Sequence, residues 1–127
     1  MINNFLIIKY IGNNDKLGLR INKEFFIHHF KKQKINNELL VLEIMKFVES
    51  HNVKLDKNFS IIVNQGPGSF SGLRISLAVA KGLKISRNTR LFGYKDTDLK
   101  QFDQDNIEDL LNKNLIEKKL IKPIYLS

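Results

Sequence analysis

The chain has 127 residues, of which 43% are hydrophobic and 27% charged, and it contains no cysteine. This size suits one domain with one core, and the composition argues against a wholly disordered chain. The lack of cysteine excludes disulfides, thiolate zinc sites and a cysteine nucleophile. The net charge of +8 fits either affinity for an anionic partner or a general drift of composition toward lysine. The scarcity of arginine favours drift, because it occurs only at Arg20, Arg74, Arg87 and Arg90.

The first ten residues predict no targeting segment. Only Phe5–Ile8 is continuously apolar, which is too short for the hydrophobic part of a signal peptide. It is also far short of the roughly 20 residues that a membrane span needs. We therefore expect a cytoplasmic protein that makes no membrane contact.

The first thirty residues predict three antiparallel strands. Phe5–Tyr10 is a short apolar strand, and the alternating segment Leu17–Ile21 is a half-buried one. Asn22 and Lys23 suit a tight hairpin turn, which leads into a third strand over Phe25–Phe30.

A helix is predicted over Ile35–Ser50, with Asn36 or Asn37 as its N-terminal cap. One side of this helix carries a broad apolar arc that should pack on a sheet, made of Leu40, Val41, Ile44, Met45, Phe47 and Val48. A smaller apolar stripe is left over on another side, made of Ile35, Leu39 and Leu42.

The middle of the chain has the order strand, glycine-rich loop, helix, strand. The expected strands are Phe59–Val63 and Leu91–Tyr94, joined by the loop Gly66–Gly72 and a helix over Leu73–Ile85. Such a unit pairs its two strands in parallel. The sequence therefore predicts one α/β domain with a mixed five-stranded sheet, in the strand order 3-2-1-4-5.

The C-terminal part is richer in acid. We expect a helix over Asn106–Lys119 that ends before Pro123, followed by an extended piece over Ile124–Leu126. The carboxylates suit a solvated face or local pairing with lysine better than a metal site; they are Asp96, Asp98, Asp103, Asp105, Glu108 and Asp109.

Residues 66–83, GPGSFSGLRISLAVAKGL, carry most of the functional information. A glycine-rich turn before a helix either offers free amides to an anion or seats a closely packed helix. The spacing does not match a P-loop, because Gly72 is followed by Leu-Arg instead of Lys-Ser or Lys-Thr, and it does not match a dinucleotide motif. Ser69 or Ser71 can cap the helix.

The same segment closely resembles the hallmark of the TsaB (YeaZ) family, Gly-Pro-Gly-Ser-Phe-Thr-Gly-Leu-Arg followed by a small-residue helix that ends in Ala-Lys-Gly-Leu. Only Ser71 departs, and it keeps the hydroxyl. The order of elements over Phe5–Tyr94 resembles the family's N-terminal domain, and Lys122–Leu126 resembles its C-terminal ending. The resemblance implies an actin/Hsp70-like (ribonuclease-H-like) half-fold over residues 1–95. Residues 96–127 are then expected to pack on it in place of the second lobe.

The resemblance also implies a role. TsaB proteins are regarded as scaffolds that pair through helices with TsaD, the subunit that transfers threonylcarbamoyl to tRNA, while the ATPase TsaE joins the same assembly. The chain is thus expected to be a non-catalytic subunit in threonylcarbamoyladenosine formation, without a cofactor. Contact with tRNA and a homodimer of the isolated chain stay open. The alternatives are a homodimeric binding module and a metal-dependent hydrolase or protease.

Two features depart from the family. The Asp-Thr-Ser that usually follows the first strand is replaced by Lys9-Tyr10-Ile11, which removes a carboxylate suited to hydrated magnesium. Only about thirty residues separate the motif domain from the terminal Tyr-Leu, where the family usually has a second domain. The comparison with the family therefore predicts no independent nucleotide hydrolysis and no cleft between two lobes of one chain.

The usual catalytic residue types are weakly supported. His28 and His29 are adjacent in a strand and should point to opposite faces, so they are not expected to share a metal ion. His51 lies at a helix end, where a capping or solvated role is favoured. No histidine has a motif-like placement beside Ser69 or Ser71, so a cap is favoured over a nucleophile.

The second helix and its loop are the predicted contact region. Arg74 suits contact with a partner, with tRNA or with a nucleotide phosphate, or anchoring of the loop.

Small side chains at Ser76 and Ala80 permit a close helix crossing, whereas burial under the C-terminal helix is the competing explanation. Which side of the helix points outward stays open: one side has Ile75, Ala78, Val79 and Gly82. The predicted motif-loop residues are Gly66, Pro67, Gly68, Ser69, Phe70, Ser71, Gly72 and Arg74. The predicted interface residues are Ile35, Leu39, Leu42, Leu73, Ser76, Leu77, Ala80 and Lys84.

Overall fold

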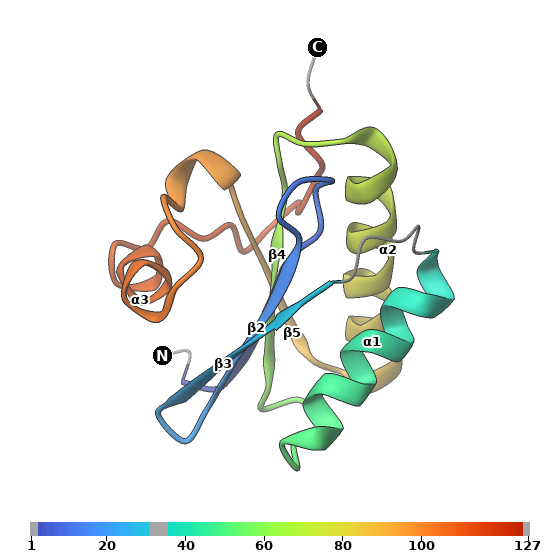
Figure 1. Ribbon diagram of the computed structural model, residues 1–127, viewed down its shortest axis with the longest axis vertical. Helices are drawn as coiled ribbons and strands as arrows, with labels where there is room; N and C mark the ends of the chain where they lie inside the picture. The colour runs from blue at the N-terminus through green and yellow to red at the C-terminus, as the bar shows by residue number, and fades with distance from the viewer. Residues whose placement is uncertain (1–2, 31–35, 126–127) are drawn as a thin grey trace.

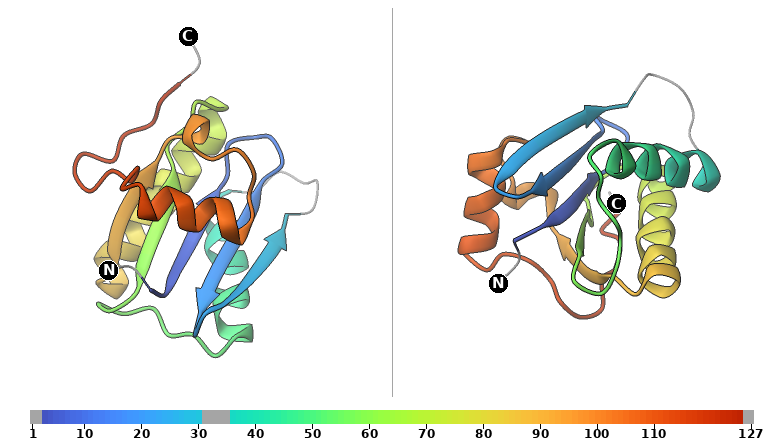
Figure 2. Two further views of the ribbon diagram at one scale, coloured as in Figure 1. Left: turned by 90° about the vertical axis from the view of Figure 1, so that its left-hand side faces the viewer. Right: turned by 90° about the horizontal axis from the view of Figure 1, so that it is seen from below.

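A five-stranded sheet runs through the molecule, with α1 and α2 on one face and α3 on the other (Figures 1 and 2). The computed structural model describes residues 3–30 and 36–125. The strands are β1 (Phe5–Lys9), β2 (Lys16–Ile21), β3 (Glu24–His29), β4 (Ser60–Asn64) and β5 (Arg90–Tyr94). The helices are α1 (Asn37–Ser50), α2 (Phe70–Arg87), the short 3-10 helix η1 (Asp96–Asp98) and α3 (Gln104–Asn112).

The sheet has the predicted mixed topology, with the order β3-β2-β1-β4-β5. β1, β2 and β3 pair antiparallel, whereas β4 pairs parallel with both β1 and β5. The hairpin between β2 and β3 turns at Asn22 and Lys23, whose φ angles are 51° and 70°. Two positive φ angles in a two-residue loop match the twist of the flanking strands, so the predicted turn is confirmed.

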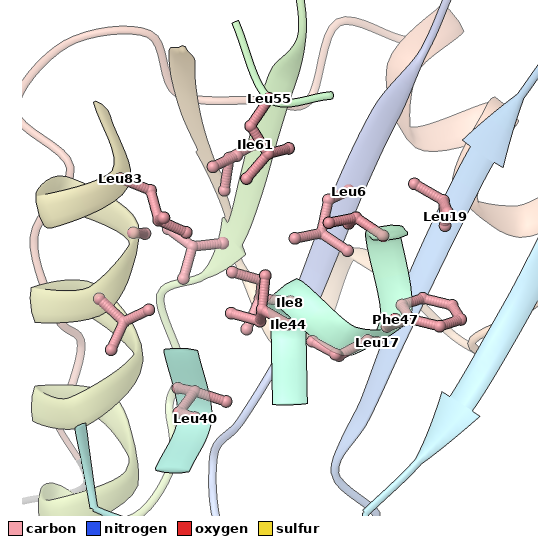
Figure 3. Close-up of a cluster of buried hydrophobic side chains, with 14 of the residues drawn as sticks. Leu6, Ile8, Leu17, Leu19, Leu40, Ile44, Phe47, Leu55, Ile61 and Leu83 are labelled. Carbon is pink, nitrogen blue, oxygen red and sulfur yellow. The ribbon is translucent and has the colours of Figure 1, made fainter. Parts of the chain in front are cut away.

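The α1–α2 face holds the larger core (Figure 3). Asn36 caps α1, since its side chain accepts the N–H of Leu39 at 2.9 Å. The predicted start of this helix at Ile35 lies outside the described residues. The predicted arc of α1 is confirmed on the sheet side, where Leu40, Ile44, Phe47 and Val48 are buried.

β4 lies in the sheet interior and is buried along its whole length. Ile61 and Val63 join the core under α1 and α2, whereas Ile62 joins the cluster under α3. This alternation explains the continuous apolar run, since both faces of the strand are covered.

α2 begins earlier than predicted. Ser69 caps it by accepting the N–H of Gly72 at 3.2 Å, so the second half of the glycine-rich loop already forms the first helical turn. The predicted start at Leu73 is therefore wrong. The helix also passes the predicted end at Ile85, because Asn88 supplies the left-handed residue that terminates it after Arg87.

α3 is shorter than predicted. It ends at Asn112, and Asn114 has a φ of 57°, which breaks the helix well before Pro123. The chain then pairs with the outer edge of β5, where the backbones of Gly93 and Glu117 exchange hydrogen bonds of 2.9 and 2.7 Å. Pairing of the strand edge outweighs helical propensity here.

α3 covers the second face of the sheet. Ile107 and Leu110 of α3 are buried, and the sheet side of this cluster consists of Phe5, Ile7, Ile62 and Tyr94. The N-terminal cap of α3 is Asp103, whose carboxylate accepts the N–H and the side-chain amide of Asn106 at 2.9 and 2.8 Å. These hydrogen bonds lower the pKa of the Asp103 carboxyl.

Among the described helices, none is both long enough and apolar enough to cross a lipid bilayer.

Candidate partner-binding site

The loop of the TsaB-like motif lies where β4 ends and α2 begins, against the β1–β2 turn (Figure 1). The N–H of Ser69 donates to the carbonyl of Ile11 at 2.8 Å, and the carbonyl of Gly66 accepts the N–H of Asp96 at 2.8 Å. The N–H groups of Gly72 and Leu73 are bound to Ser69. These amides already have partners within the chain, so the geometry favours a loop that packs α2 against the sheet over a loop that binds an anion.

Two glycines show why this loop tolerates little change. Gly66 has a φ of 98°, and a β-carbon there would meet the carbonyl of Ile124. A β-carbon on Gly72 would lie 2.8 Å from the hydroxyl of Ser69 and would block the cap. The glycines thus serve the chain's own packing.

Asn64 and Gln65 position the loop, although the sequence did not single them out. The Asn64 side chain accepts the N–H of Gly66 at 2.8 Å, and it donates to the Tyr94 hydroxyl at 3.1 Å and to Asp96 at 3.0 Å. Burial raises the pKa of the Tyr94 hydroxyl, an effect that the Asn64 hydrogen bond partly offsets. A pair of amides directly after a continuous apolar strand is the signal that could have revealed this network.

The C-terminal tail completes the loop's surroundings. The N–H of Ile124 donates to the carbonyl of Gln65 at 2.6 Å, and the side chain of Gln65 donates to the carbonyl of Lys122 at 3.0 Å. Tyr125 forms a parallel bridge with Gly68. The two segments that resemble the TsaB family, the motif and the tail, are therefore in direct contact.

An exposed aromatic cluster marks the start of α2. The rings of Phe70 and Tyr125 lie 4.9 Å apart, and the guanidinium of Arg74 lies 5.1 Å from the Phe70 ring centre. Within the described residues, Arg74 makes this ring contact and neither a hydrogen bond nor an ion pair. Of its two predicted roles, the structure favours outward contact over anchoring of the loop.

The structure decides which side of α2 points outward. The interface prediction is wrong for four residues of α2, because they are buried between the helix and the rest of the core: Leu73, Ser76, Leu77 and Ala80. They face inward since the sheet takes the more continuous of the two apolar sides. Ala78 and Gly82, on the other predicted side, are exposed, as is Lys84.

The remaining interface predictions lie at the surface. Leu39 and Leu42 of α1 are 40% and 47% exposed, and α2 adds Phe70 at 59% and Ile85 at 84%. Ile35 lies outside the described residues. Such large exposed hydrophobic side chains on two neighbouring helices are typical of a protein-binding surface.

The histidines have structural contacts. His28 lies 2.8 Å from Glu43 of α1. His51 is the C-terminal cap residue of α1, as predicted, and its ring also stacks on Phe26 with ring centres 4.0 Å apart, a contact that the sequence did not predict. Ser69 acts as the cap described above. In the described part of the chain, no three His, Cys, Asp or Glu side chains lie together as metal ligands.

A hollow of about 380 Å³ lies beside the β1–β2 turn. Three of its lining residues are lysines and two are aspartates: Lys9, Lys16, Lys100, Asp96 and Asp103. Lys9 stands where the family usually has a carboxylate. The amines outnumber the carboxylates, so the hollow suits a divalent cation poorly.

Comparison with known proteins places this arrangement in a family. The family described as "TsaD: tRNA N6-adenosine threonylcarbamoyltransferase" matches residues 33–98, just over half of the chain. The curated protein "tRNA threonylcarbamoyladenosine biosynthesis protein TsaB" of Buchnera aphidicola subsp. Baizongia pistaciae is 38% identical over 63 residues. The chain belongs to the family of this TsaD model, and the curated relative that it resembles is a TsaB protein.

Solved structures of TsaB-type proteins share the fold. YeaZ from Pseudomonas aeruginosa superposes with a TM-score of 0.68 at 18% identity, over 77% of this chain and 46% of that one. A protein from the same organism, described as similar to peptidase YEAZ, gives 0.67 at 18% identity, over 77% and 45%. This likeness confirms the predicted α/β fold. The alignment with the Buchnera protein covers 48% of this chain and 28% of that protein, so the chain spans less than half of these relatives.

Proposed function

We propose that this TsaB-type chain is a non-enzymatic subunit that pairs with TsaD in forming threonylcarbamoyladenosine on tRNA. The observation that carries the proposal is the exposed apolar surface of α1 and α2. Its large side chains are Leu39, Leu42, Phe70 and Ile85. All four lie within the residues that match the TsaD family.

The packing of the motif loop supports this role. The loop ties the start of α2 to the β1–β2 turn, to η1 and to the tail through backbone pairing, so the beginning of the helix is held in place. A rigid surface loses little conformational entropy when a partner binds. The motif then acts indirectly, by fixing the helix that carries the contact residues.

Other members of the assembly are proposed to meet this chain through the complex. TsaE is expected to join by way of TsaD, and the exposed cations of α2 are available to tRNA. A second copy of the chain would compete for the same surface, which makes a homodimer of the isolated protein the main alternative.

Deletion of the gene tests the proposed pathway. We expect threonylcarbamoyladenosine, measured by mass spectrometry of digested tRNA, to fall in the deleted strain and to return with the wild-type gene. An Ile85→Asp gene should fail to restore it, whereas Lys113→Asp, a matched surface change beyond α3, should succeed. An unchanged level of the modified nucleoside after deletion would contradict the proposal.

A further inference from the structure

A second hollow, of about 750 Å³, lies on the α3 side of the sheet, which α3 crosses in Figure 2. Its lining includes Arg20 near the end of β2 and Arg90 at the start of β5. These two arginines lie in one row across the sheet, because Phe5 pairs with both Arg20 and Ser60, and Ser60 pairs with Arg90. The row is at the end of the sheet away from the motif loop. The volume falls within the range of about 300–1,000 Å³ that is typical of small-molecule sites.

The hollow has more positive than negative charge. Three of its described lining residues are cations, Arg20, Arg90 and Lys118, and Glu108 is the sole carboxylate among them. Glu108 is already paired with Nη1 of Arg20 at 3.0 Å. Arg90 and Lys118 form no ion pair with any described residue. The surplus charge therefore suits an anion.

The arginines of the hollow need an explanation of their own. Arginine is rare in this chain, and two of its four arginines line this hollow, so a general drift toward lysine does not account for them. The Nε of Arg20 is buried and has no hydrogen-bond partner among the described residues. Arg20 thus has hydrogen-bonding capacity that Glu108 does not use. The planar guanidinium group matches the geometry of a phosphate.

Phe92 gives the hollow an apolar wall. Its side chain packs on the α3 side of the sheet, and Arg90, two residues earlier on β5, shares that side. The antiparallel bridge between Gly93 and Glu117 sets Lys118 opposite Phe92. The half-buried apolar side chains that line the hollow are Phe92, Leu111 and Ile116. Apolar surface and two unpaired cations therefore meet at the edge of the sheet.

We propose that this hollow binds a nucleoside phosphate, either free or as an unpaired nucleotide of an RNA strand. Arg90 and Lys118 hold the phosphate, and the flat base covers the ring of Phe92. Three asparagines of the lining supply donors and acceptors for the edge of the base; they are Asn3, Asn112 and Asn114.

The proposed site is independent of pairing with TsaD. The hollow and the exposed surface of α1 and α2 lie on opposite sides of the sheet (Figure 2). Of the residues that line the hollow, only Arg90 and Phe92 lie within residues 33–98, which match the TsaD family. The site is therefore built mainly from the part of the chain that the family model does not match.

Other anions fit the hollow less well. Inorganic phosphate would leave the apolar wall at Phe92 in contact with water. An extended acidic peptide would need a free strand edge, but the edge of β5 beside the hollow is already paired with Glu117. The carbonyls of the last turn of α3, which would repel a phosphate, already accept the N–H groups of residues 113–115.

An NMR titration of the isotope-labelled full chain with the common ribonucleoside monophosphates tests the proposal. We expect saturable shifts of the amides of residues 90–92 and 111–118, with a dissociation constant below about 1 mM for at least one nucleotide. The same nucleoside without its phosphate should bind at least about tenfold more weakly.

Single substitutions locate the site. Arg90→Gln and Lys118→Gln should each raise the dissociation constant at least about fivefold. The matched control Lys81→Gln, which removes the same charge from α2 on the other side of the sheet, should bind within about twofold of wild type. All three side chains are exposed, so the variants should melt within about 2 °C of wild type, which separates lost binding from lost folding.

A short single-stranded RNA and folded tRNA identify the source of the nucleotide. If RNA shifts the same amides and binds at least about tenfold more tightly than the free nucleotide, the occupant is an RNA strand. If RNA binds no more tightly, the occupant is a free nucleotide. Both results support the proposal, provided that Arg90→Gln weakens the binding.

Three results would overturn the proposal. The first is no saturation by any nucleotide or RNA up to about 10 mM of nucleotide units. The second is equally tight binding of inorganic phosphate or of an oligoglutamate peptide, which would show that the base contributes nothing. The third is unchanged affinity in both Arg90→Gln and Lys118→Gln. None of these results bears on pairing with TsaD, and a failure to pair with TsaD would leave this site standing.

Discussion

The glycine-rich loop and the outward side of α2 belong to one continuous motif, yet their contacts differ completely. The glycines of the loop are crowded: Gly66, Gly68 and Gly72 lie against Ile124, Ile11 and Ser69. The outward side of α2 contacts little within the described chain, and Gly82 and Ile85 are open to solvent.

This difference separates two physical reasons for similar residue types. Glycine in the loop is required by the positive φ of Gly66 and by close contacts at Gly68 and Gly72, so its replacement should damage folding. Glycine in the exposed helix lowers stability, so its replacement should damage only association with a partner. The following predictions test this separation, from the largest expected effect to the smallest.

Aspartate at two apolar positions of α2 should give opposite results. Leu77 is 5% exposed, so Leu77→Asp should lower the free energy of unfolding by more than about 4 kcal/mol, because it removes core packing and buries a charge. Ile85→Asp should change it by less than about 0.5 kcal/mol. Urea denaturation followed by circular dichroism measures both. Similar losses in the two variants would contradict the assignment of inward and outward sides.

Alanine at Gly66 should destabilise the protein strongly. The position has a φ of 98°, and the new β-carbon would meet the carbonyl of Ile124. We expect a loss of about 2–4 kcal/mol in the free energy of unfolding, from backbone strain and steric conflict together. An unchanged free energy of unfolding in thermal and urea denaturation would show that the loop does not constrain the backbone at Gly66.

The two serines of the loop should differ. Ser69→Ala removes the side-chain acceptor of the Gly72 N–H and should cost about 1 kcal/mol. Ser71 is exposed and does not act as the cap, so Ser71→Ala should change stability by less than about 0.5 kcal/mol. Equal effects of the two substitutions on the urea midpoint would argue against Ser69 as the cap.

Alanine at Gly82 should stabilise the isolated chain. No described atom would obstruct the methyl group, and alanine favours the helix by about 0.5–1 kcal/mol over glycine. The melting temperature should therefore rise. A fall would mean that Gly82 serves an internal contact, and the contrast with Gly66 would disappear.

The cap of α3 should add a small pH dependence that the neutral cap of α2 lacks. Hydrogen bonds to the Asp103 carboxylate lower its pKa in the folded chain. Its contribution is present above the pKa of the unfolded state and is lost as the pH falls through the lower folded value, below about pH 4. The stability difference between wild type and Asp103→Asn should shrink in acid, whereas that between wild type and Ser69→Ala should stay constant. Parallel urea titrations across pH 3–7 provide the check.

The fold was predictable because strong local patterns agreed. The Asn22-Lys23 turn, the apolar arc of α1 and the apolar centre of β4 each favour one structure, and all three agree with the observed sheet order. The α3 boundary was not predictable, because the edge of β5 competes for residues near Glu117. That competition depends on a contact distant in sequence.

The contact surface was predictable only in part. Both sides of α2 contain apolar and small residues, so periodicity alone could not decide which side meets the sheet. Exposure of Leu39 and Leu42 follows from their place outside the main arc of α1, whereas burial of Leu77 depends on the completed core. The buried amides of Asn64 and Gln65 were missed because their partners, Tyr94 and Lys122, are distant in sequence.

The most direct test of the central claim is the mass of a mixture of this chain with TsaD from the same source. Size-exclusion chromatography with light scattering should show one species that contains both proteins and is heavier than either alone. Ile85→Asp should restore two separate peaks without unfolding the chain. Two unshifted peaks from the wild-type mixture would contradict the account if both proteins are present at about 10 μM or more. At that concentration, a complex with a dissociation constant of about 1 μM would be detected.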